Sequence, residues 1–143
     1  MEFDPATDYP LGTRRPDLVA TPSGIPLEDV TLEALRAGRI GSDDIRATPE
    51  TLRRQAAVAR HAGRKPLADT LERAAELAAV PAETMLELYT ALRPHRSTAA
   101  GLEAWSLRLE HELGAPATAE FVREASAVYA ERGLLRDRAE AAL

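Results

Sequence analysis

Apolar residues recur at helical spacing through most of this chain. In its central part three successive stretches carry such a pattern, and each has a proline near its start: Pro49, Pro66 and Pro81. Proline is tolerated in the first turn of a helix, because the amide hydrogen that it lacks would have no partner there. The pattern therefore predicts three short helices in succession between Thr48 and Thr98.

The apolar faces of these three helices are narrow and rich in alanine. They comprise Leu52, Ala56, Ala59 and Ala62; then Leu67, Leu71, Ala74, Ala75 and Ala78; then Met85, Leu88, Tyr89 and Leu92. Alanine buries little area, whereas a fully buried Leu or Val contributes roughly 1.5–3 kcal/mol. We therefore expect a thin core and some dependence on a partner.

Two longer helices follow, one from about Thr98 to Gly114 and one from about Pro116 to Arg132. Their apolar residues are Leu102, Trp105, Leu109 and Leu113, and then Phe121, Val122, Ala125, Val128 and Tyr129. End signals include Thr48 and Ser97 as N-caps, and Gly63 and Gly133 as left-handed stops. A shorter helix is predicted between Thr31 and Gly38. Because no stretch alternates at strand period, we predict an all-α fold, a small bundle of about five helices.

The first thirty residues differ in composition, because they hold five of the ten prolines. Such spacing predicts extended segments and turns and no helix. Residues 1–30 are therefore predicted to be an extended Pro-rich N-terminal arm, and residues 31–143 a helical domain. The arm is either a disordered tail or a segment that becomes ordered against another surface; apolar residues such as Tyr9 and Leu11 favour the second.

The net charge and the composition argue against several classes of function. A net charge of −5 and an isoelectric point near 5.3 argue against a general nucleic-acid binder, which needs a basic surface. There is no cysteine, which removes disulfides and thiolate chemistry and suits the cytoplasm. No apolar run approaches the roughly 20 residues that cross a membrane, and the first ten residues do not resemble a secretory signal.

Candidate chemistry is sparse, and we predict no catalytic, cofactor-binding or metal-binding residue on this chain. His61, His95 and His111 fall on different elements, whereas a zinc site needs converging ligands. Asp43 and Asp44 could be read as a metal pair, but adjacent helical residues diverge, and acids at a helix start are the better interpretation.

Charged clusters are more conspicuous. Arg53, Arg54, Arg60, Arg64 and Lys65 either contact an acidic surface or phosphate, or form a solvated face balanced by nearby acids; we favour the second. Glu72, Glu76, Glu83 and Glu87 could do acid–base work as paired carboxylates if a pocket raised the pKa of one of them, but we interpret them as solvated or paired with Arg73 and its neighbours. Arg93, Pro94, His95 and Arg96 form a stiff corner between two helices. Since the arginine fork suits carboxylates and main-chain carbonyls, this corner is predicted to be a helix-end clamp or a docking point.

These residues also resemble a known family. The stretch TPETLRRQAAVARHAGRKPLADTLERAAELAAVPAETMLELYTALRPHRST is similar to the central region of the small (gamma) subunit of adenosylcobalamin-dependent diol and glycerol dehydratases. YPLG at residues 9–12, VTLEAL at 30–35 and FVREASAVYAERGLL at 121–135 agree with it in the same order. The string RAAELAAVP followed by LELYTALRPHRST is unusual enough to make chance a poor explanation.

The resemblance implies one partner in a heterohexamer with two copies each of large (alpha), medium (beta) and small subunits. It implies that the large subunit holds the diol and a potassium or calcium ion, and that adenosylcobalamin lies between the large and medium subunits. The reaction would convert propane-1,2-diol or glycerol to an aldehyde and water by a radical mechanism. The small subunit would be non-catalytic and dock on the large one, with Tyr9, Leu11, Arg93, His95 and Arg96 as interface residues.

Some positions depart from the family pattern. His95 stands where tyrosine is common, and Thr70 and Leu71 replace an Asn–Phe-like pair. Some relatives carry a longer N-terminal extension linked to bacterial microcompartments, so the expected location is the cytoplasm, with a microcompartment as the alternative. The competing function is a stand-alone helical adaptor or regulator that uses Arg53, Arg54, Arg60 and Arg64.

Overall fold

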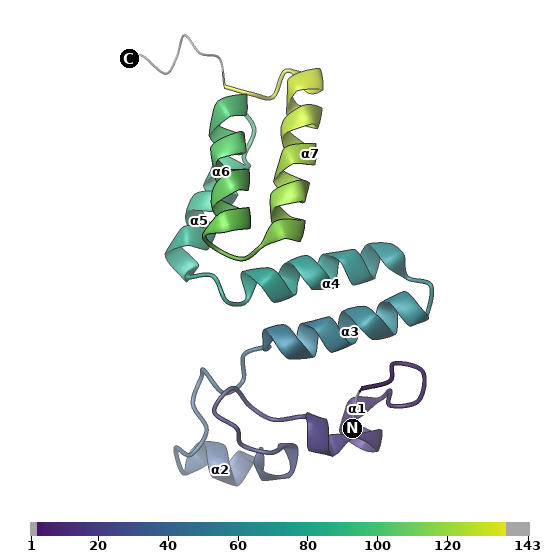
Figure 1. Ribbon diagram of the computed structural model, residues 1–143. Coiled ribbons are helices and arrows are strands. Elements are labelled where there is room, and N and C mark those ends of the chain that lie inside the picture. Colours follow the sequence, from purple (N-terminus) through teal and green to yellow (C-terminus); the bar gives the residue numbers. More distant parts are fainter. Residues whose placement is uncertain (1–2, 137–143) are drawn as a thin grey trace. The chain divides into compact units, whose positions relative to one another are not determined.

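The five longest helices of the computed structural model, which describes residues 3–136, follow one another from Pro49 onward (Figure 1). They are α3 (Pro49–His61), α4 (Lys65–Leu77), α5 (Ala82–Ala91), α6 (Ala99–His111) and α7 (Pro116–Arg132). Shorter elements precede them: α1 (Leu11–Arg14), α2 (Leu32–Arg36) and the 3₁₀ turns η1 (Pro16–Leu18) and η2 (Leu27–Asp29). The β structure in residues 3–136 is one isolated bridge between Ala20 and Pro26. The predicted all-α class is confirmed.

Local capping chemistry sets the helix ends. The Thr48 side chain accepts a hydrogen bond from the Thr51 amide at the start of α3, as Thr31 does from Ala34 at the start of α2. Gly133, with φ of 65°, ends α7 in the left-handed conformation that glycine adopts without steric cost. These predicted boundaries are confirmed.

The predicted cap of α6 is wrong by one residue. Thr98, not Ser97, is the N-cap, and its side chain accepts from the Gly101 amide. The Ser97 hydroxyl instead donates to the Ala91 carbonyl at 2.9 Å, at the end of α5. Both residue types suit a cap, and the extended backbone at Thr98, with ψ of 165°, decides between them.

The prolines of the arm do not exclude a helix everywhere, which corrects the prediction for residues 1–30. The interval between Pro10 and Pro16 holds the single turn α1, with Pro10 as its N-cap. A proline at that position sacrifices no intrahelical hydrogen bond, so the turn forms.

The chain divides into two compact units, one up to Ala78 and one from Ala79. In the first unit α3 packs against α4, as Figure 1 shows. Its buried apolar residues, within the described part of the chain, are Ala34, Ile40, Ala56, Ala59, Ala68 and Ala75. Because all but one are alanine, the predicted thin core is confirmed for this unit.

In the second unit α6 packs against α7, and α5 contacts α6. Its buried apolar residues are Leu88, Leu102, Leu109, Ala115, Ala119 and Val122. Tyr89, expected on the apolar face of α5, is 56% exposed. A helix that contacts few neighbours covers only part of its apolar face, so the edge of that face stays in solvent. None of the helices in residues 3–136 has both the length and the apolar content needed to cross a membrane.

Candidate docking site

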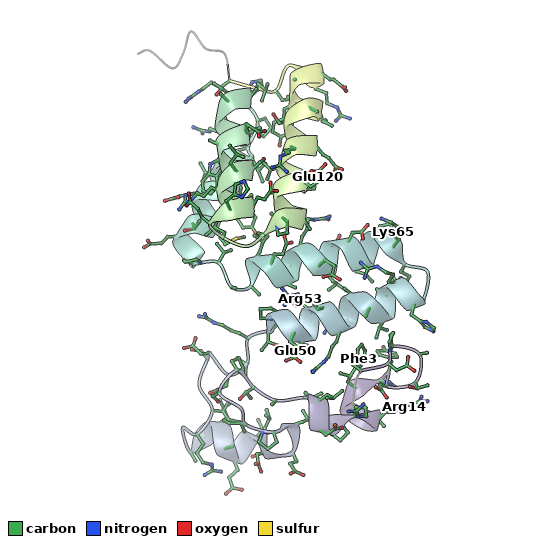
Figure 2. The ribbon with its side chains drawn as sticks, in the orientation of Figure 1. Phe3, Arg14, Glu50, Arg53, Lys65 and Glu120 are labelled. Atoms are coloured by element: carbon green, nitrogen blue, oxygen red, sulfur yellow. The ribbon has the colours of Figure 1, made fainter. Side chains whose placement is uncertain are left out.

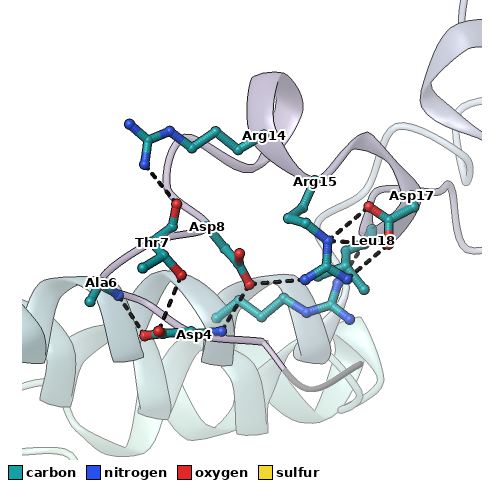
Figure 3. A network of polar contacts seen from close by, with 9 residues as sticks. Asp4, Ala6, Thr7, Asp8, Arg14, Arg15, Asp17 and Leu18 are labelled. Atoms are coloured by element: carbon teal, nitrogen blue, oxygen red, sulfur yellow. Dashed lines mark hydrogen bonds and ion pairs between the residues drawn. The ribbon is translucent and has the colours of Figure 1, made fainter.

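Ion pairs fix the segment that carries Tyr9 and Leu11 (Figure 3). Arg15 contacts Asp8 at 3.0 Å and Asp17 at 2.8 Å, and Arg14 donates to the Thr7 carbonyl at 2.7 Å. The hydrogen bond between Arg15 and Asp17 raises the pKa of the arginine and lowers the pKa of the carboxyl group. The first part of the arm is therefore a folded loop with its own polar network.

Tyr9 and Leu11 line an apolar groove in the first unit, between the arm and the α3–α4 pair. Its other lining residues are Leu18, Val19, Thr51, Arg54, Gln55, Val58, Ala59, Ala62, Arg64, Leu67 and Leu71. Tyr9 is 58% exposed, whereas Leu11 is half-buried. Arg54 of α3 connects the helix to the arm, because it donates to the Leu18 carbonyl at 2.5 Å. It also pairs with Glu50 on its own helix at 2.5 Å.

The corner residues Arg93, His95 and Arg96 are exposed and lie in the second unit. The segment that follows α7 holds their backbone in place. The His95 amide donates to the Leu134 carbonyl at 2.7 Å, and the Arg136 amide donates to the Ser97 carbonyl at 2.9 Å. His95 has a φ of 60°, a left-handed conformation that is unfavourable for a residue with a Cβ. Within residues 3–136, neither Arg93 nor Arg96 forms an ion pair.

The cationic cluster of α3 and α4 is largely balanced by acids. Arg54 pairs with Glu50, Arg60 lies 3.4 Å from Glu72, and Lys65 lies 2.7 Å from Asp69. The hydrogen bond from Lys65 lowers the pKa of Asp69. Figure 2 labels Glu50 and Arg53 on α3 and Lys65 at the start of α4. This geometry supports a solvated, charge-balanced face.

The aspartates considered as a metal pair have separate partners. Asp43 pairs with Arg46 at 3.1 Å, whereas Asp44 accepts from Ser23 at 2.5 Å and from the Gly41 amide at 2.9 Å. The Ser23 hydrogen bond lowers the pKa of Asp44. In the part of the chain that the structure describes, no three His, Asp or Glu side chains gather to hold a metal ion.

Comparison with known proteins decides the family. Residues 5–136 match the dehydratase small subunit family. The chain belongs to this family. It is 49% identical over 130 residues to the propanediol dehydratase small subunit of Citrobacter freundii, and 48% identical to that of Salmonella typhimurium. Each alignment covers 91% of this chain, and 76% and 75% of the two relatives, respectively. The resemblance noted from the sequence is confirmed.

In this dehydratase small subunit, the predicted interface residues form two groups. Tyr9 and Leu11 belong to the first unit, and Arg93, His95 and Arg96 to the second. Sequence reasoning missed the charged network of the second unit, in which Arg123 pairs with Glu110 and lies 3.5 Å from Glu120 and 4.0 Å from Glu103. The spacing of Glu120 and Arg123, three residues apart on one helix, was the available signal.

Proposed function

We propose that this chain is the small subunit of a cobalamin-dependent propanediol dehydratase, and that it supports the assembled enzyme by docking on its partner subunits. The identity of 49% to a propanediol dehydratase small subunit across 91% of the chain carries this proposal. The substrate class is propane-1,2-diol rather than glycerol, because both relatives are named for propanediol.

The packing of the first unit supports a docking role. Its buried residues are mostly alanines, which contribute little hydrophobic free energy, while Leu32 is 71% exposed and Ile45 is 72% exposed. A partner that covers such side chains adds the apolar burial that the unit lacks. Obligate interfaces commonly bury more than about 2,000 Å² in total, enough to supply it.

Tyr9, Leu11, Arg93, His95 and Arg96 are the proposed interface residues. Tyr9 presents a large aromatic surface at the mouth of an apolar groove, and tyrosine and arginine are common among residues that dominate binding energy. Arg93 and Arg96 lie on a corner whose backbone is hydrogen-bonded to the segment that follows α7. A rigid site loses less conformational entropy when a partner binds.

The chemistry of the holoenzyme belongs to the partner subunits in this proposal. Adenosylcobalamin supplies the radical that starts the conversion of the diol to an aldehyde and water. Following what the family resemblance implies, we assign the cofactor, the metal ion and all catalytic residues to the large and medium subunits, in a heterohexamer with two copies of each subunit. The proposed location is the bacterial cytoplasm, free or inside a microcompartment.

Co-expression tests the proposal. A tagged form of this chain should co-purify with the large and medium propanediol dehydratase subunits in one species on size exclusion. The control is co-expression with the two subunits of an unrelated heteromeric enzyme, which should not be retained. Failure of this chain to co-purify with the dehydratase subunits would remove it from that enzyme.

A further inference from the structure

A shallow hollow lies on the second unit, where α5 contacts α6. Its lining residues are Leu86, Glu87, Thr90, Ala91, Arg96, Ser97 and Trp105. Leu86 is 66% exposed at its edge, although it is a large apolar residue. The hollow therefore combines an apolar surface with the second arginine of the corner.

Two hydroxyl groups of the hollow are already used within the chain. Thr90 donates to the Leu86 carbonyl at 2.8 Å, and Ser97 donates to the Ala91 carbonyl at 2.9 Å. Neither hydroxyl hydrogen is available to a ligand without loss of an existing hydrogen bond. These two residues therefore offer a ligand hydrogen-bond acceptors but no unused donor.

The acid of the hollow is also paired. Glu87 lies 3.4 Å from Arg108, which in turn lies 3.7 Å from Glu112. The Arg108 guanidinium is 4.9 Å from the centre of the Trp105 ring, within the range of a cation–π contact. Arg108 therefore lies beside the tryptophan ring and offsets part of the negative charge of Glu87.

Arg96 is the exception among the charged lining residues, since within residues 3–136 no carboxylate pairs with it. In the part of the chain that the structure describes, the hollow thus combines an apolar surface with one guanidinium, that of Arg96, to which no carboxylate is paired. The complementary surface carries one carboxylate beside an apolar side chain. Tryptophan and arginine are both enriched among residues that dominate binding energy, and arginine binds a carboxylate through two parallel hydrogen bonds.

We propose that this hollow receives a segment of a partner dehydratase subunit in which an Asp or Glu side chain pairs with Arg96 while a neighbouring apolar side chain covers Leu86 and Trp105. The inference rests on the proposed function, because it names the chemistry of the partner at the corner. The proposal gives Arg96 and Arg93 different roles, because Arg96 lines the hollow and Arg93 does not. A nucleic acid fits less well, because the guanidinium of Arg96 alone, on a chain of charge −5, provides little phosphate neutralisation.

The test uses co-purification of the full chain with the tagged large and medium subunits, with turnover per assembled complex measured separately. Arg96→Glu and Leu86→Asp should each weaken association about tenfold or more, since the first reverses the charge that pairs with the partner's carboxylate and the second removes the apolar contact. Arg96→Lys should retain part of the affinity, because it keeps the charge and loses the fork. Arg53→Glu makes the same charge change on an exposed residue of α3 and should leave association unchanged.

The outcomes distinguish the two proposals. If the wild-type chain assembles and Arg96→Glu assembles equally well, the docking hollow is wrong while the proposed function stands. If the wild-type chain does not assemble, both fail. If Arg96→Glu abolishes retention of the free chain on immobilised nucleic acid and leaves subunit assembly intact, the hollow binds nucleic acid and the proposal is overturned.

Discussion

The Tyr129 hydroxyl on α7 donates a hydrogen bond to the Leu92 carbonyl at the end of α5, across 37 positions of the sequence. This bond satisfies a carbonyl that the helix itself leaves without a partner. It also holds the end of α5, from which the Arg93–Arg96 corner starts.

We expect Tyr129→Phe to destabilise the chain by about 1 kcal/mol, because a carbonyl at the helix end loses its donor while the ring remains. Denaturant unfolding followed by circular dichroism measures the change. Tyr89→Phe is the matched control, since Tyr89 is 56% exposed, and it should leave the unfolding free energy unchanged. Equal stability of the wild type and the Tyr129 variant would show that the hydrogen bond contributes nothing.

The contact between α3 and α4 depends on small side chains. Ala56 and Ala68 are completely buried and lie in one cluster with Ala59. Ala56→Leu should destabilise the chain by about 1–3 kcal/mol, because three extra carbons must enter a packed interface. The same substitution at the exposed Ala104 of α6 should change stability by less than about 0.5 kcal/mol. Similar stabilities of the two variants would contradict close packing at Ala56.

The Arg123 network predicts a pH-dependent contribution to stability. The hydrogen bond from Arg123 lowers the pKa of Glu110 from its ordinary value of 4.5. A carboxyl group whose pKa is lower in the folded state stabilises the fold above its unfolded pKa, and this contribution is lost as the pH falls through the folded value. The pair of Arg123 and Glu110 therefore stabilises the fold at pH 7, and this contribution disappears in acid.

Arg123→Gln should accordingly lower the melting temperature at pH 7, and the difference from the wild type should shrink as the pH falls below 4.5. Thermal unfolding monitored from pH 7 to pH 3 measures this. Arg132→Gln on the same helix is the control, because within the described residues Arg132 forms no ion pair. A deficit that persists unchanged at pH 3 would contradict the ion-pair mechanism and indicate lost packing.

Arg54 holds the arm to α3 through the Leu18 carbonyl. We expect Arg54→Ala to accelerate proteolytic cleavage within residues 1–30 of the free chain, because local opening of the arm becomes easier. Arg53→Ala removes a neighbouring exposed arginine and should leave the cleavage rate unchanged. In the assembled enzyme both variants should be cleaved slowly if the partner covers the arm. Equal rates in the free and assembled forms would show that the arm is not docked.

Helix ends could be predicted from the sequence because capping is local chemistry. Thr48, Thr31 and Gly133 act within four residues of the amides and carbonyls that they serve, so the neighbouring sequence is sufficient. The choice between Ser97 and Thr98 could not be predicted, because it depends on the backbone angles of a corner that Leu134 and Arg136 hold from the far end of the chain.

The surfaces were harder to predict than the helices. An apolar stripe shows which face of a helix can be buried, but the neighbouring helix decides how much of it is covered, and Tyr89 stays in solvent for that reason. The candidate site residues Arg93 and Arg96 are three positions apart, yet only Arg96 lines the hollow that contains Trp105. That difference arises from tertiary packing, which the periodic pattern of apolar residues in the sequence does not predict.

The most direct test of the account is the diol dehydratase activity of the large and medium subunits co-expressed with and without this chain, at equal amounts of large subunit and saturating adenosylcobalamin. We predict that aldehyde formation from propane-1,2-diol requires this chain, because the assembled complex does not accumulate without it. Equal activity and equal recovery of the complex in its absence would contradict its role as the small subunit.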